Sequence, residues 1–117
     1  MPFLTNPAFA VREVNNVTGI RAYNVEYTNL TGRTMFVHTT HILTFLTEGD
    51  NVLIQSLVGG INQGNVGIAG YPIPAAPLGS IEEFALDMIV PPGVTYQLVP
   101  AVAGTGTAVL QSWFEAL

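Results

Sequence analysis

The sequence predicts an all-β protein, an antiparallel β-sandwich or jelly-roll-like domain of about seven to eight strands with an extended N-terminal arm. Runs rich in β-branched and aromatic residues recur along the chain, and turn signals containing Gly and Pro separate them. Few stretches show the apolar spacing of an amphipathic helix. A length of 117 residues suits a single core. We therefore expect one sandwich domain over residues 17–117, preceded by an arm over residues 1–16.

The predicted arm has the composition of an extended segment. Two prolines favour an extended backbone and oppose a helix, and the segment lacks the basic start and continuous apolar stretch of a secretory signal. Phe3, Leu4 and Phe9 give it apolar side chains that a solvated tail does not need. Two interpretations remain open: the segment packs on its own core, or it docks on a neighbouring subunit. In the second case these three residues are candidate contacts.

Three strands are expected in the first half of the sandwich. Residues 17–28 are rich in β-branched and aromatic residues, and residues 23–28 alternate apolar and polar side chains with a period of two, which is typical of a strand with one buried face. Residues 34–47 form a run that is long for one strand, so we expect a bulge or bend near Thr39 and Thr40. The third strand is expected over residues 52–58.

The second half opens with a stretch rich in Gly and Pro. Residues 59–80 hold six glycines and three prolines, which predicts an irregular loop of the kind that a partner often orders. A strand is expected over residues 81–90, with a short helix near residues 82–84 as an alternative. The Pro-Pro-Gly sequence at residues 91–93 predicts a tight turn. The remaining strands are expected over residues 95–99 and 107–115.

The charge content limits the possible partners. Charged residues make up 9% of the chain, against about a quarter in an ordinary domain, and the net charge is −5 with no lysine. This balance argues against nucleic acid or an anionic membrane surface as a partner. Residues 51–81 and 88–114 carry no formal charge. Such a surface is expected to be buried against other subunits, although a neutral Thr- and Asn-rich surface can also face water.

No arrangement of residues predicts catalysis. His38 and His41 are three positions apart on an expected strand, so they face opposite sides of the sheet and do not share a metal ion unless a bulge intervenes. Glu82 and Glu83 are adjacent and are likewise expected on opposite faces. The chain has no cysteine, and no serine lies in a nucleophile-elbow pattern. We therefore expect no enzyme activity, and no catalytic, cofactor-binding or metal-binding residue.

The aromatic residues offer candidate contacts with other molecules. Trp113 and Phe114 are neighbours on an expected strand, so only one of them faces the core. The other must meet solvent, a ligand or another subunit. Trp113 and Phe114 could also form a platform that stacks on carbohydrate, together with Tyr71, Tyr96 and Tyr27, but most aromatic residues in strands belong to the core. Tyr71, Trp113 and Phe114 are thus further candidates for subunit or capsid contacts.

Three segments resemble small β-sandwich modules of tailed bacteriophages. Residues 21–33, RAYNVEYTNLTGR, are similar to the opening of these modules, in which a Tyr-Thr-Asn-x-Thr-Gly pattern precedes Arg or Lys. Residues 90–96, VPPGVTY, are similar to their Val-Pro-Pro-Gly turn, and residues 111–117, QSWFEAL, resemble their Trp-x-Glu ending. The matching residues fall on expected turns and strand starts, so they speak for the fold and not for a binding site.

The resemblance implies a virion protein. In that family the module is trimeric and serves as a capsid decoration (cement) protein or as the tip of a tail fibre. A homotrimer is then expected on the capsid surface, bound to the major capsid protein after synthesis in the host cytoplasm. A fibre tip normally follows a long stalk, whereas about sixteen residues precede the expected sandwich here, which favours decoration. The alternatives are a tail-associated tip or adaptor that recognises host-surface glycan, and a binding module outside any virion.

Overall fold

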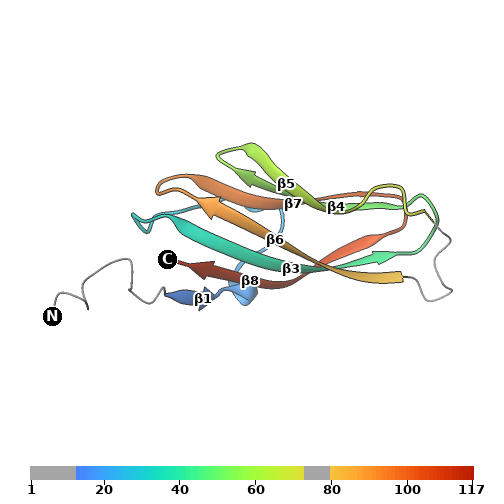
Figure 1. Cartoon of the computed structure of the whole chain (residues 1–117), viewed down its shortest axis with the longest axis horizontal. Coiled ribbons are helices and arrows are strands. Elements are labelled where there is room, and N and C mark those ends of the chain that lie inside the picture. The colour runs from blue at the N-terminus through green and yellow to red at the C-terminus, as the bar shows by residue number, and fades with distance from the viewer. Residues whose placement is uncertain (1–12, 73–79) are drawn as a thin grey trace.

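The computed structural model describes residues 13–72 and 80–117, and the statements below concern these residues. Within them eight strands form two antiparallel four-stranded sheets that pack face to face (Figure 1), so the predicted β-sandwich is confirmed. The elements are β1 (Val14–Asn16), the 3-10 turn η1 (Thr18–Ile20), β2 (Tyr27–Thr28), β3 (Met35–Phe45), β4 (Asn51–Val58), β5 (Ile61–Ile68), β6 (Ser80–Val90), β7 (Thr95–Ala103) and β8 (Thr107–Ala116).

The strand order is that of a jelly roll. One sheet, the β3 sheet, has the order β1-β8-β3-β6, and the other, the β4 sheet, has the order β2-β7-β4-β5. Strand β1 pairs with β8, β2 with β7, β3 with β6 and β4 with β5, all antiparallel. This is the pairing of one long hairpin folded over itself, which is how a jelly roll closes two sheets around one core.

Alternating side chains of the long strands fill the core. Every second residue of β3 and β4 is buried, as expected for strands with one face on the core. The rings of Phe45 and Tyr71 stack with their centroids 4.7 Å apart. Burying each large apolar side chain contributes about 1.5–3 kcal/mol. The largest fully buried apolar side chains are those of Trp113, Phe45, Met35, Leu43, Ile54 and Leu98.

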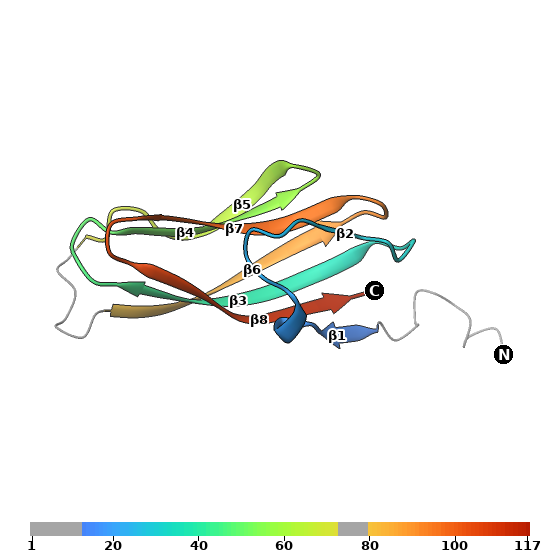
Figure 2. The ribbon, with the colours of Figure 1, turned by 180° about the vertical axis from the view of Figure 1, so that it is seen from behind.

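The prediction of one strand over residues 17–28 is wrong. Only Tyr27 and Thr28 pair with β7, and the segment before them passes η1 and crosses from the β3 sheet to the β4 sheet (Figure 2). Asn24 has a φ of 62°, which no regular strand accommodates. The apolar alternation is present, but long-range side-chain contacts of Arg21 and Tyr23, described below, place this segment between the sheets.

The prediction of an irregular loop over residues 59–80 is wrong for its first half. Strand β5 pairs with β4 through a two-residue turn at Gly59 and Gly60, whose φ angles are 62° and 78°. Positive φ at both positions is the type I′ turn that suits a hairpin, and a Gly-Gly pair between apolar residues is a recognised signal for it. At Gly67 a side chain is excluded, because a Cβ would run into the backbone of Val52. Residues 73–79 lie outside the described residues.

The other expected strands are present. The expected strand over residues 81–90 is β6, which excludes the alternative of a short helix, and β7 extends four residues beyond the expected end at Val99. The register between β3 and β8 shifts between Thr40 and His41, where the bulge was expected, although the extra residue is Gln111 on β8. The predicted boundary at residue 17 is late, because residues 14–16 pair with β8 as β1.

Candidate interaction surface

Two of the expected contact residues belong to the core. Trp113 is fully buried and Tyr71 is 7% exposed, so neither can contact a subunit, a capsid or a carbohydrate through the surface, and this expectation is wrong. The Trp113 indole N–H donates to the carboxylate of Glu115 at 3.0 Å, and the Tyr71 hydroxyl donates to Ser80 at 2.6 Å. Both polar groups are therefore also satisfied inside the protein.

Phe114 remains at the surface. It is half-buried on the outward side of β8, opposite His38 of β3 and Asn16 of β1. The prediction that Trp113 and Phe114 point to opposite faces is therefore confirmed. The bulge at Gln111 decides which one points inward, because it shifts the inward positions of β8 by one residue. Phe3, Leu4 and Phe9 lie outside the described residues.

Phe114 is part of an apolar outer surface on the β3 sheet. We call the outward side of this sheet the β3 face. One apolar row crosses all four strands, from Val14 on β1 through Ala116 on β8 and Phe36 on β3 to Ile89 on β6. Further along, Val109 of β8 lies beside Ile42 of β3. Within residues 13–72 and 80–117, five of the eleven exposed large apolar residues lie on this face, namely Val14, Phe36, Ile81, Ile89 and Val109.

A polar band crosses the middle of the β3 face. His38 and Asp87, on adjacent strands, lie 2.6 Å apart between Nδ1 and Oδ1, and both are exposed. Beside them the hydroxyls of Thr40 and Ser112 are hydrogen-bonded at 2.5 Å. Glu83 is the remaining ionisable outward residue among those described on this sheet. The face therefore carries exposed apolar side chains toward both ends, although Glu83 lies beside Ile42 at one of them, and its charges are few.

The outward side of the β4 sheet is different. Among the residues that the structure describes, it carries no ionisable side chain, and none of its outward residues is an exposed large apolar residue. Amide side chains alternate there with small and half-buried apolar ones, so this side has little apolar surface left to cover. The outward residues are Thr28, Asn51, Leu53, Gln55, Leu57, Asn62, Asn65, Gly67, Thr95, Gln97, Val99, Ala101 and Ala103.

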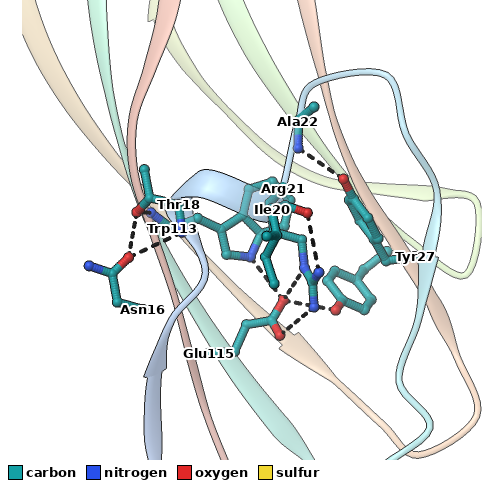
Figure 3. A network of polar contacts seen from close by, with 9 residues as sticks. Asn16, Thr18, Ile20, Arg21, Ala22, Tyr27, Trp113 and Glu115 are labelled. Atoms are coloured by element: carbon teal, nitrogen blue, oxygen red, sulfur yellow. Dashed lines mark hydrogen bonds and ion pairs between the residues drawn. The ribbon is translucent and has the colours of Figure 1, made fainter.

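A part-buried ion pair attaches the crossing segment to the sandwich. The Arg21 guanidinium donates twice to Glu115, from Nε and Nη2, each at 2.9 Å (Figure 3). The Tyr96 hydroxyl and the Trp113 indole also donate to this carboxylate, at 2.8 and 3.0 Å. The Arg21 guanidinium lies 4.6 Å from the centroid of the Tyr27 ring, and its hydrogen bond to Glu115 raises the pKa of Arg21. All these groups are satisfied by one another, which fits a structural role.

His41 is a second buried ionisable group. The Thr39 hydroxyl donates to the Leu86 carbonyl, so it must accept from His41 Nε2, and Nδ1 of the neutral ring then accepts from the Tyr23 hydroxyl at 2.6 Å. Burial lowers the pKa of His41 to about 4 and raises that of Tyr23. Because His38 is exposed, the prediction that the two histidines face opposite sides is confirmed. Both ring nitrogens of His41 have hydrogen-bond partners inside the protein, so this residue has a structural role in the core.

Two of the segments that resemble phage modules meet at Asn29. This side chain is buried, and its amide donates to the carbonyls of Arg33 at 2.7 Å and Val90 at 2.9 Å. The backbone N–H of Asn29 donates to the Val94 carbonyl, and the Gly93 N–H donates to the Asn29 carbonyl. From the sequence, these two motifs are expected to form separate turns. In the fold, hydrogen bonds of Asn29 join the two turns, so the role of the motifs is structural.

Other kinds of site are not seen in the described part of the chain. No pocket opens among residues 13–72 and 80–117, and no three metal-ligating side chains come together there. No helix within the same residues has the length and apolarity needed to cross a membrane. No protein-family model, no curated protein and no solved structure matches the chain. The β3 face is therefore the strongest candidate for a functional surface.

Proposed function

We propose that the chain is a structural protein of a bacteriophage virion, a capsid decoration (cement) protein that binds the outside of the shell and stabilises it. It acts as a homotrimer in contact with the major capsid protein. The observation that carries the proposal is the apolar, charge-poor β3 face on a jelly roll whose described residues open no pocket. Such a molecule presents surfaces for assembly and keeps its polar chemistry inside.

The distribution of polar groups supports an assembly role. Arg21, Glu115 and His41 are each held by partners within the chain and hold the fold together. What remains for other molecules includes the charge-poor β3 face with its exposed apolar side chains. Burying apolar surface contributes about 25 cal/mol per Å², so small contacts repeated over a shell add up to a large resistance to rupture.

The resemblance to phage modules supports the same proposal in a limited way. The motif residues around Asn29 hold turns, so they favour the fold of those modules and leave the partner to be tested. The tail-tip alternative used an aromatic platform of Trp113, Phe114, Tyr71, Tyr96 and Tyr27. Trp113, Tyr71 and Tyr96 are buried, so these residues do not form a platform at the surface and no specific observation favours that alternative.

The deciding experiment is quantitative mass spectrometry of purified virions of the phage that encodes the chain. We expect copies of the same order as the major capsid protein. A copy number far below the shell protein moves the chain to the tail or portal, and its absence from virions overturns the proposal.

The predicted arm is tested separately. Deleting residues 1–10 should abolish binding to undecorated capsids while the purified protein remains a folded oligomer, measured by co-sedimentation and light scattering. Deletion variants that still decorate capsids contradict the arm as the shell contact.

A further inference from the structure

We infer that the β3 face is where one copy of this chain packs against another. The inference goes beyond the proposed homotrimer and does not rest on the virion role, because two copies that meet through the same face form a two-fold pair. It starts from the difference between the two outer sheet surfaces. In the described part of the chain, five exposed large apolar residues lie on the β3 face and none points outward from the β4 sheet, although both surfaces belong to the same small domain.

The β3 face is large enough for a stable contact. Its three long strands, β8, β3 and β6, have ten or eleven residues each. At about 3.3 Å per residue and about 4.8 Å between strands, they cover roughly 500 Å² per copy. Two such surfaces in contact bury roughly 1,000 Å², which is the size at which specific protein interfaces begin. The side chains of β1 extend the face beyond this area.

The charges of the β3 face favour a second copy over a strongly charged partner. Asp87 is paired with His38, and Glu83 has no ion-pair partner among the described residues. A basic partner therefore finds one unpaired carboxylate to complement. A second copy, which also carries a net charge of −5, can approach here with little repulsion. Apolar rows on both copies then meet rows of the same kind, as in the charge-depleted interfaces of homo-oligomers.

The arrangement of the apolar residues also suits a broad contact. Ile89 and Val109 lie on strands that flank β3, one on each side, and toward opposite ends of it. Between them lies the polar band of His38, Asp87 and Thr40, which gives the contact a defined register. A partner that covers both apolar ends must be at least as broad as the sheet, which a second sandwich is.

The test is the oligomeric state of the purified full chain and of single-residue variants. The face variants are Ile89→Glu and Val109→Glu, at positions 61% and 58% exposed. The matched control is Ile61→Glu, at a position 66% exposed on β5 and away from the β3 face. Sedimentation velocity is measured over a dilution series, and far-UV circular dichroism and Tm report folding.

We expect the unaltered chain and Ile61→Glu to form the same oligomer. Each face variant should be folded and self-associate at least about tenfold more weakly, because a buried carboxylate at an interface is costly. A chain that is monomeric at about 100 μM, well above the Kd of a functional oligomer, overturns the inference. Folded face variants that associate as tightly as the control overturn it as well.

A second measurement does not depend on the glutamate variants folding. The chain has no cysteine, so Val109→Cys and Ile61→Cys each introduce a single thiol. Maleimide labelling at position 109 should slow at least about tenfold as protein concentration rises, while labelling at position 61 stays constant. Equal behaviour of the two thiols overturns the inference. Both experiments use the isolated chain. A chain that does not self-associate through the β3 face is therefore a different result from a chain that is absent from virions.

Discussion

At each end of β3, one buried polar side chain joins two turns by hydrogen bonds, and the two side chains differ in chemistry. At the N-terminal end the buried amide of Asn29 joins the turn after β2 to the turn after β6, by donating to Arg33 and Val90 carbonyls. At the C-terminal end the buried carboxylate of Asp50 joins the turn after β3 to the turn after β7, by accepting from the N–H groups of Leu46 and Thr105. Each end therefore depends on one side chain.

The difference shows how the turns select the side chain that joins them. The turns around Asn29 leave carbonyl oxygens facing inward, and these require a donor. The turns around Asp50 leave N–H and hydroxyl groups facing inward, and these require acceptors. An amide offers donors as well as an acceptor, whereas an ionised carboxylate offers acceptors only. One end is therefore indifferent to pH, and the other relies on a charge.

Replacing the charged side chain should give the largest effect. The substitution Asp50→Ala leaves backbone N–H groups of Leu46, Thr47 and Thr105 without acceptors inside the protein. We expect Tm to fall by at least about 10 °C, measured by calorimetry at pH 7. The control is Glu26→Ala, which removes an exposed carboxylate outside the β3 face and should change Tm by only a few degrees, roughly. Equal shifts for the two variants contradict the role given to Asp50.

Replacing the amide of Asn29 by a carboxylate, at the N-terminal end of β3, should give the next largest effect. The substitution Asn29→Asp places a carboxylate against the carbonyls of Arg33 and Val90, at the distances the amide now occupies. We expect a loss of about 3 kcal/mol in the free energy of unfolding at pH 7. Part of it should return as the pH falls, because a protonated carboxyl group can donate again.

Urea denaturation at pH 7 and at pH 4 measures both parts of this effect. The control is Asn15→Asp, at an exposed position on β1, with an expected change within about 0.5 kcal/mol. If Asn29→Asp is no less stable than this control, or loses further stability on acidification relative to the unaltered chain, the donor role of Asn29 is wrong.

Sequence patterns located β3 and β4 because their burial alternates over eleven and eight residues. They missed the position of the segment before β2, because contacts with residues far along the chain place it. Arg21 reaches Glu115, which is 94 residues away, and no local period records that contact. The Gly59-Gly60 pair is a hairpin signal on its own. It was missed because the many glycines of residues 59–80 together predicted an irregular loop.

The candidate surface was only partly readable from the sequence. Alternation showed that Trp113 and Phe114 face opposite ways, but the bulge at Gln111 decides which one is buried. The β3 face is assembled from β1, β8, β3 and β6, which are distant in sequence. Single exposed apolar residues such as Ile89 therefore gave no signal until the strand order placed them in one row.

A pH profile separates the ends of β3 from its middle. His41 has a pKa of about 4 in the folded protein and an ordinary value near 6.5 when unfolded. Between these values the unfolded chain binds a proton that the folded chain does not, so stability falls as the pH drops from about 6.5 to about 4. The expected loss is roughly 2–3 kcal/mol. The pKa of Asp50 is held below its ordinary value by N–H donors, so its contribution is lost only at lower pH.

Urea denaturation between pH 4.5 and 7.5 measures this slope. It should disappear in His41→Gln and persist in His38→Gln, which alters the exposed histidine. If the slope persists in His41→Gln, other groups cause it. The middle and the ends of β3 then do not differ in the pH range over which they lose stability.

The smallest expected effects come from the threonines that support each end. The Thr31 hydroxyl bonds to the Asn29 side-chain oxygen at 2.6 Å, and the Thr105 hydroxyl lies 3.1 Å from Oδ2 of Asp50. A hydrogen bond to a charged acceptor is the stronger kind, so Thr105→Ala should cost about 1.5 kcal/mol and Thr31→Ala about 1 kcal/mol. Urea denaturation at pH 7 with an unchanged m-value measures both. If Thr31→Ala loses more unfolding free energy than Thr105→Ala, the expected order is wrong. The Asn29 end then depends more on its supporting hydroxyl than the Asp50 end does.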